Sequence, residues 1–197
     1  NLPYVWFGIF EEPRQLPFSI QSISQENIDI QWQLLISQDE YKQIIHNIRE
    51  NISCGNVYQV NYTFPLQSNC SGSLLTLFYR LCFAQGSGYF VYIQTDNHTV
   101  LSISPELFFH YYNGEIMLKP MKGTRPRGKW YEEDEYNYRE LQKDPKDRAE
   151  NLMIVDLLRN DIGKIAHFGS VDVPKLFTCE PYRTVWQMTS TIKAKTH

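Results

Sequence analysis

The chain has 197 residues, of which 42% are hydrophobic and 14% aromatic, and a formal net charge of −3. That composition is sufficient for a packed core, and the slightly acidic balance argues against a general role in binding nucleic acids or anionic membranes. No apolar run reaches the length of about 18 residues that predicts a membrane-spanning helix. The chain also shows no signal-peptide pattern at its start, and its four cysteines are scattered without a C-x-x-C pair. These features predict a cytoplasmic protein with reduced cysteines.

The first predicted element is a helix that begins at a capping box. Ser37 and Glu40 have the spacing of that motif, and apolar residues follow at helical spacing as far as Ile52, before Gly55 ends the run. The next residues, Val57–Phe64, alternate between apolar and polar side chains. This alternation predicts a strand that presents three polar side chains on one face, those of Gln59, Asn61 and Thr63.

The rest of the chain alternates between helical and strand patterns. A second helix is predicted over Leu74–Phe83, followed by strands over Tyr89–Thr95, Thr99–Ile103, Leu107–Tyr112 and Glu115–Leu118, the last two joined by the hairpin signal Asn113–Gly114. The charged residues 129–144 predict a solvated loop or surface helix. Asp144 and Pro145 are typical of the N-cap and first position of a further helix. Strand-like segments follow near Val171–Val173 and over Trp186–Ala194. The sequence therefore predicts an α+β fold of mixed, largely antiparallel sheets with helices packed on the outside.

One lysine lies in a segment rich in proline, glycine and basic residues, Lys119–Gly128. The spacing of its prolines and glycine predicts a rigid turn around Lys122. Cationic neighbours favour the neutral, nucleophilic form of an amine, and Lys119, Arg125 and Arg127 are candidates for that role. The alternative is a basic surface loop or anion site, which this segment taken alone favours.

Two glutamates are further candidates. Glu150 shares a helical face with Met153, Ile154 and Leu157, and a carboxylate in such a setting needs a partner such as Mg²⁺. The alternative, an ion pair with a nearby arginine, is favoured by the sequence alone. Three aspartates on other faces of that helix are expected to be caps or surface ion pairs (Asp147, Asp156 and Asp161). Glu106 follows a proline at a strand junction, where a raised pKa would make it a general acid, although a single glutamate is a weak signal.

Read jointly, these segments resemble the chorismate-utilising enzymes over most of the chain, from Tyr41 to Ile192. The resembling segments are Ile52–Thr63, Ser102–Phe108, the lysine segment, the glutamate helix, Gly169–Pro174 and Thr184–Ser190. The resemblance implies the chorismate-binding enzyme fold. Within the family, the motifs are most similar to component I of the aminodeoxychorismate synthases, and component I of the anthranilate synthases is the near relative and the alternative.

The resemblance also implies residue roles. Lys122 would attack C2 of chorismate covalently, and Glu106 would protonate the departing 4-hydroxyl. Glu150 would be one of the glutamates that hold Mg²⁺ against the ring carboxylate. Ammonia from a glutamine amidotransferase subunit or domain would then enter at C4 and expel the lysine. The product would be 4-amino-4-deoxychorismate, the precursor of 4-aminobenzoate for folate synthesis.

Four further residues are implied at the substrate site: Gly123, Thr124, Gln59 and Gln187. Gln59 occupies the position at which isochorismate and salicylate synthases have a lysine that activates water, and an amide is a poor base. Gln187 occupies the position of a histidine that anthranilate-type members use in pyruvate elimination. Both replacements favour a non-aromatic aminated product.

The family continues for longer than this chain, so the resemblance implies that residues 1–197 form a single, incomplete chorismate-binding domain, without the N-terminal and C-terminal portions of a parent enzyme. Such a fragment is expected to be inactive by itself. The non-enzymatic alternative is a fragment that only binds a protein partner.

Overall fold

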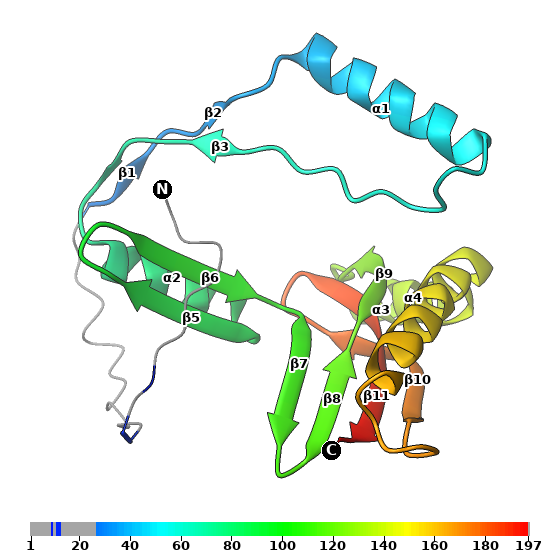
Figure 1. Ribbon diagram of the computed structural model, residues 1–197. Helices are drawn as coiled ribbons and strands as arrows, with labels where there is room; N and C mark the ends of the chain where they lie inside the picture. The colour runs from blue at the N-terminus through cyan, green and yellow to red at the C-terminus, as the bar shows by residue number, and fades with distance from the viewer. Residues whose placement is uncertain (1–8, 10, 13–26, 197) are drawn as a thin grey trace. The chain divides into compact units, whose positions relative to one another are not determined.

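The structure is a computed structural model that describes residues 9, 11–12 and 27–196. Contacts divide the chain into two units, residues 1–77 and 78–197, which are described separately. The helices and strands of both are labelled in Figure 1. Every strand pairing in the described part is antiparallel. The predicted α+β class is therefore confirmed, whereas the prediction of one incomplete domain over residues 1–197 stays a prediction.

The first unit contains the predicted capped helix and two short strand pairs. Helix α1 (Gln38–Ser53) begins at Ser37, whose Oγ accepts a hydrogen bond from the Glu40 N–H at 3.2 Å. The Glu40 carboxylate accepts in return from the Ser37 N–H at 2.9 Å, and this bond lowers the pKa of Glu40 below its usual value. The capping box is thereby confirmed. The strand pairs are β1 (Asp29–Ile30) with β4 (Cys70–Ser71), and β2 (Gln33–Leu34) with β3 (Leu66–Gln67).

The strand predicted over Val57–Phe64 is wrong, because none of these residues pairs with another strand. Two of their aromatic side chains lie against α1 instead: the ring centroids of Tyr62 and Phe64 lie 6.0 Å and 5.8 Å from that of Tyr41. Alternation along a segment describes a side chain's environment, but a strand also needs a neighbouring strand to satisfy its backbone groups. Here ring packing on a helix produces the same alternation without a ladder.

Helix α2 (Leu74–Gln85) spans the boundary between the units, and its later residues pack on the β5–β6 hairpin of the second. Strands β5 (Tyr89–Gln94) and β6 (Thr99–Ser104) pair over their whole length. The Phe78 ring of α2 lies 5.5 Å from that of Tyr92. Arg183 donates to the Phe83 carbonyl at 2.8 Å and so satisfies a backbone acceptor at the end of α2.

The larger sheet of the second unit is organised around one long strand. Its strands are β7 (Leu107–Tyr112), β8 (Glu115–Lys119), β9 (Met121–Pro126), β10 (Asp172–Pro181) and β11 (Val185–Lys195). The order is β10-β11-β8-β7, and β9 also pairs with β11. The first half of β11 pairs with β9 and the second half with β8, while β10 occupies its other edge. The predicted hairpin between β7 and β8 is confirmed, with positive φ values of 49° at Asn113 and 76° at Gly114.

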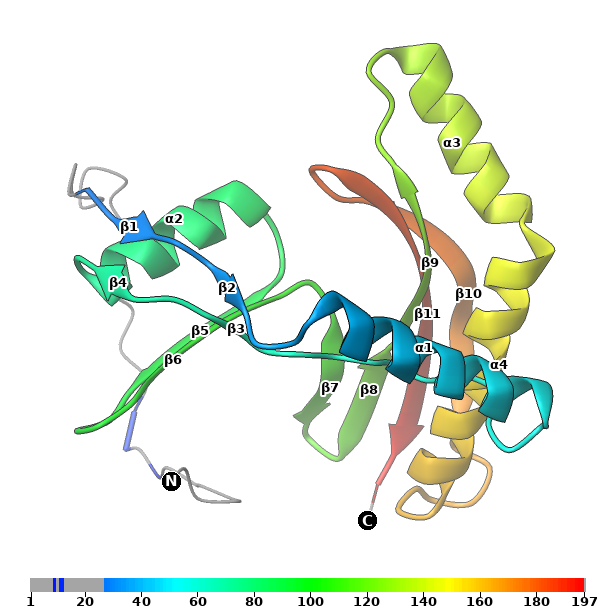
Figure 2. The ribbon, with the colours of Figure 1, turned by 90° about the horizontal axis from the view of Figure 1, so that it is seen from above.

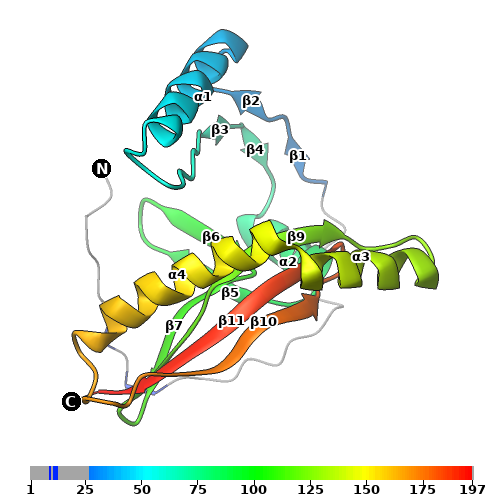
Figure 3. The same ribbon diagram turned by 90° about the vertical axis from the view of Figure 1, so that its right-hand side faces the viewer.

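Two helices lie on one face of this sheet, as Figure 2 shows. Helix α3 (Tyr131–Lys143) is the second of the two predicted alternatives, a surface helix, and α4 (Pro145–Gly163) begins at the predicted cap. Both contact β9 and β11, and Figure 3 shows α4 running along the sheet beside β11. The core between helix and sheet contains Leu118, Val155, Ile162, Ile192 and Ala194. No helix in the described ranges is long and apolar enough to cross a membrane.

The start of α3 is fixed to the sheet through Asp134. The Arg127 guanidinium donates to both carboxylate oxygens of Asp134, at 2.8 Å and 2.6 Å. The Trp186 indole N–H and the Gly128 backbone N–H also donate to this carboxylate, at 3.0 Å and 2.8 Å. Arg127 in turn lies 4.7 Å from the Trp186 ring centroid. The hydrogen bonds from Arg127, followed by those from Gly128 and Trp186, hold the pKa of Asp134 far below its usual range.

We expect Asp134→Asn to be less stable than the wild type at neutral pH and to respond less to acid. A depressed pKa means that the ionised group contributes stability above its unfolded pKa of about 3.9, which is lost as the pH falls through the folded pKa. Urea midpoints measured from neutral pH to about pH 2 should therefore converge for the two proteins. Asp156→Asn is the matched control, because Asp156 forms an exposed ion pair with Arg159 on α4. Parallel acid profiles for the wild type and Asp134→Asn would contradict the assignment.

Candidate functional site

Lys122 lies on strand β9, at a β-bulge, so the predicted turn is wrong. Met121 pairs with Thr189 and Thr124 pairs with Gln187, which leaves two residues of β9, Lys122 and Gly123, opposite one residue of β11. The prolines that suggested a turn lie outside the strand or at its last position, where β9 is an edge strand and can accept them. Bulges bend a strand and change the direction of its side chains. The conformation around Lys122 is therefore set by sheet pairing.

Glycine is required at the second position of this bulge. Gly123 has a φ of +96°, which a residue with a side chain adopts only with strain. A Cβ at this position would also lie 3.0 Å from the Asp147 Cβ and 3.1 Å from the Leu141 Cδ1. The close approach of α3 and α4 to the bulge thus depends on the missing side chain.

Each cation that the sequence places near Lys122 is paired with a carboxylate. Lys119 lies 2.7 Å from Glu180, and Arg127 is held by Asp134. Arg125 lies 2.8 Å from both Asp144 and Asp147 at the start of α4. The three are therefore not the uncompensated positive neighbours that the sequence suggested. Lys122 itself is half-buried, and its side-chain amine has no hydrogen bond or ion pair to the described residues, so the amine is available to a ligand.

Glu106 is hydrogen bonded to the strand that carries Lys122. It lies between β6 and β7, and its Oε1 accepts a hydrogen bond from the Met121 backbone N–H at 2.8 Å. Ser104 fixes the Glu106 backbone, because its Oγ accepts from the Glu106 N–H at 3.2 Å and donates to the Glu106 carbonyl at 3.0 Å. The Glu106 carboxylate is therefore bonded to the backbone of the residue before Lys122, and it is exposed.

Thr124 and Gln187 form a polar pair one residue beyond the bulge. The Thr124 hydroxyl donates to the Gln187 Oε1 at 3.0 Å. Gln187 also lines a cavity of about 150 Å³, together with Pro105 and Tyr182. The Tyr182 hydroxyl donates to the Pro105 carbonyl at 3.2 Å, and burial raises the pKa of Tyr182. The cavity therefore adjoins the residue that precedes Glu106.

Glu150 does not lie on the buried face of α4, so the prediction of an apolar setting is wrong. The buried residues of this helix are Asp147, Asn151, Val155 and Ile162. The Glu150 side chain is 32% exposed, and its nearest cation is Lys146 at 3.5 Å, whose own side chain is 82% exposed. The expected ion pair thus forms with a lysine one turn earlier in place of an arginine, and such exposed pairs contribute little stability.

Asp147 was also placed wrongly by the sequence, which assigned it to the surface. It is buried because Arg125 reaches it from β9, so the charge is compensated. The signal that could have identified it is its spacing of four residues from Asn151, which makes a polar stripe facing the sheet. Asp156 and Asp161 form surface ion pairs with Arg159 and Lys164, as expected.

The described residues contain no group of three His, Cys, Asp or Glu side chains close enough to enclose a metal ion. Mg²⁺ commonly takes only one or two protein carboxylates and completes its shell with water and substrate oxygens. Glu150 fits one such ligand, since it is accessible and has only a weakly held lysine as partner. Asp147 does not fit, because Arg125 occupies it.

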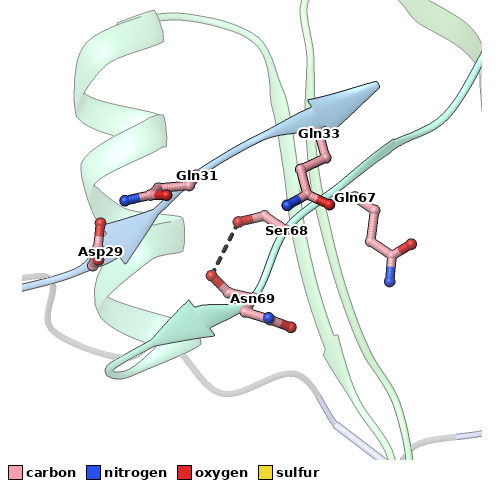
Figure 4. Close-up of a pocket in the computed structure, with 6 residues that line it drawn as sticks. All are labelled: Asp29, Gln31, Gln33, Gln67, Ser68 and Asn69. Carbon is pink, nitrogen blue, oxygen red and sulfur yellow. Dashed lines mark hydrogen bonds between the residues drawn. The ribbon is translucent and has the colours of Figure 1, made fainter. Parts of the chain in front are cut away.

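Gln59 belongs to the first unit, where its side chain is exposed, and its role in substrate binding stays a prediction. The same unit has a polar pocket of about 310 Å³, shown in Figure 4, which contains none of the candidate residues. Its lining consists of Asp29, Gln31, Gln33, Gln67, Ser68 and Asn69.

The fold is that of known chorismate enzymes. The structure resembles anthranilate synthase component I from Streptococcus pneumoniae with a TM-score of 0.77 and 26% identity, covering 85% of this chain and 37% of that one. The sequence is 40% identical over 164 residues to aminodeoxychorismate synthase component 1 of Klebsiella aerogenes, covering 83% of this chain and 36% of the relative. It is 35% identical over 161 residues to anthranilate synthase component 1 of Aquifex aeolicus (strain VF5), covering 82% of this chain and 33% of the relative.

The family model of chorismate binding enzymes matches residues 19–197. This chain therefore belongs to the chorismate binding enzyme family. It spans about a third of the length of the curated relatives just described.

Proposed function

We propose that this chain carries the lysine-bearing part of an enzyme of the aminodeoxychorismate synthase component I type, which aminates chorismate at C4. One observation carries the proposal. Lys122 is held at a β-bulge without a partner among the described residues, and the Glu106 carboxylate is hydrogen bonded to the backbone of the residue before it. An amine and a carboxyl group in this arrangement suit nucleophilic attack assisted by a general acid.

In the proposed reaction, the neutral Lys122 amine forms a bond to C2 of chorismate. The ring double bonds shift, and the C4–oxygen bond breaks as protonated Glu106 donates a proton, so that the hydroxyl leaves as water. Ammonia then adds at C4, the double bonds shift back, and the Lys122 nitrogen leaves C2. The sum is chorismate plus ammonia giving 4-amino-4-deoxychorismate plus water. Thr124 and Gln187 would hydrogen bond to the substrate, and Gly123 would contribute through the backbone of the bulge.

A Mg²⁺ ion would supply charge neutralisation and orientation of the substrate carboxylate. This chain would contribute Glu150 as one ligand. The ammonia would come from a glutamine amidotransferase, either a separate subunit or a fused domain, which ammonium salts should replace in an assay.

We expect Glu150→Gln to raise the Mg²⁺ concentration required for half-maximal activity by on the order of tenfold. The amide keeps the size of the side chain but removes the negative charge that attracts the ion. The measurement is a Mg²⁺ titration of activity. It uses the complete gene product, the whole protein that the gene containing these residues encodes. Asp156→Asn is the control, because it removes an exposed charge from the same helix. An unchanged Mg²⁺ requirement in Glu150→Gln would return Glu150 to a surface ion pair with Lys146.

The reaction itself is tested by the product that the complete gene product forms from chorismate, Mg²⁺ and ammonium. A product that retains the enolpyruvyl group, identified by mass and absorbance, supports the proposal. Anthranilate with released pyruvate would support the alternative, an anthranilate synthase activity. The similarity of the chain to anthranilate synthases favours that alternative. The absence of any turnover would favour a chain that only binds a protein partner.

A further inference from the structure

The β-bulge is tied to helix α4 through a fully buried amide. Asn151 has an exposed fraction of 0% and lies one helical turn after Asp147, on the face of α4 that meets the sheet. Its Nδ2 donates to the Met188 carbonyl at 3.3 Å, and Met188 is the residue opposite Lys122 and Gly123. A buried amide is unfavourable unless its groups are hydrogen bonded, so this contact specifies one arrangement of helix and strand.

The second hydrogen bond of this amide extends the connection to both neighbouring strands. The Ser190 hydroxyl donates to the Asn151 Oδ1 at 2.5 Å and accepts from the Phe177 backbone N–H of β10 at 3.1 Å. The Ser190 backbone N–H donates to the Pro120 carbonyl, directly before β9, at 3.2 Å. Phe177 has a φ of 56°, a conformation that a non-glycine residue holds only when its surroundings fix it. Asn151 and Ser190 therefore connect α4 to β11 near Met188. Through Ser190 the connection extends to the backbones of Phe177 and Pro120, on either side of β11.

We propose that Asn151 is a positioning residue, which holds Met188 and the bulge opposite it in the geometry that presents the Lys122 amine. The inference rests on the proposed function for its catalytic consequence, but the positioning itself does not depend on the reaction. Asn151 contacts β11 and does not need to touch the substrate. Packing alone does not require an amide at this place in a helix–sheet core. The next buried residue on the same face of α4, Val155, packs there with an apolar side chain.

The test uses Asn151→Asp in the complete gene product. This change keeps the side-chain shape and the acceptor for Ser190, but it removes the N–H that donates to the Met188 carbonyl. Val155→Ala is the matched control, since Val155 lies on the same helix face but packs in the core cluster with Leu118 and Ile192. Ser190→Ala is the second variant, in case Asn151→Asp does not fold.

Two readouts separate positioning from a general loss of stability. The first is the rate at which a small amine-reactive ester labels Lys122 without chorismate, measured by peptide mass spectrometry relative to the exposed Lys193. We expect a several-fold change in this ratio for Asn151→Asp and no change for Val155→Ala. The second is the kinetic split: kcat should fall by on the order of tenfold to a hundredfold while KM changes little, since a small misplacement of a reacting group has effects of that size.

Unchanged Lys122 labelling in a folded Asn151→Asp or Ser190→Ala variant would overturn the proposal. The proposal would also be overturned if Asn151→Asp and Val155→Ala lost the same amount of kcat at the same decrease in Tm. If the wild type forms no aminated product, the proposed function fails, and the labelling comparison still decides whether Asn151 positions Lys122.

Discussion

Replacing Lys122 with alanine should lower kcat of the complete gene product by about 10³-fold or more and abolish any covalent adduct with chorismate. Among the cations from Lys119 to Arg127, Lys122 has no carboxylate partner in the described residues, whereas the others are ion-paired. No neighbour in this segment can therefore replace its amine. The measurements are steady-state kinetics with ammonium and intact-mass analysis after rapid quenching, followed by peptide mapping.

Lys193→Ala is the control for this experiment, because Lys193 is an exposed lysine of β11 and lies outside the bulge. Lys122→Arg is a second comparison, since it keeps the positive charge but removes the nucleophilic amine. An adduct of unchanged yield that maps to another residue would remove Lys122 from the mechanism, and full activity of Lys122→Arg would assign it to charge alone.

Substituting alanine at Gly123 should destabilise the fold by about 2–5 kcal/mol, the sum of about 1–2 kcal/mol for backbone strain and about 1–3 kcal/mol for overpacking. The strain follows from the φ of +96°, and the overpacking from the contacts of a new Cβ with Asp147 and Leu141. The free energy of unfolding from urea denaturation measures the effect.

Gly169→Ala is the matched control, because Gly169 has a similar φ of +76° but no atom within 4 Å of the position of a new Cβ. It should therefore show the backbone strain alone, about 1–2 kcal/mol. The difference between the two variants isolates the packing of α3 and α4 on the bulge. Equal losses would show that these helices do not constrain Gly123.

Elements with local causes could be predicted from the sequence. The helix α4 begins where Asp144 accepts from the N–H groups of Lys146 and Asp147 and Pro145 occupies the first position, all of which are neighbours in the chain. The β7–β8 hairpin was equally accessible, because Asn113 and Gly114 tolerate the positive φ values that its turn requires.

Features with distant causes could not be predicted. Periodicity assigned Glu150 to the buried face of α4, but the polar residues Asp147 and Asn151 occupy that face because Arg125 and the backbone of β11 provide their partners. The bulge at Lys122 likewise depends on pairing with a strand some sixty residues later, at Met188. The candidate residues could be named from the sequence, whereas their partners and geometry could not.

The central place of β11 has a consequence for the order of folding. Strands β8, β9 and β10 all take hydrogen bonds from β11, which follows every one of them in the chain. During synthesis, the β7–β8 hairpin and helices α3 and α4 can form early, since their contacts are local. The bulge that carries Lys122 has no partner until β11 has left the ribosome. We therefore expect the lysine site to appear late and in one cooperative step, with the slow kinetics of a sheet closed by contacts distant in sequence.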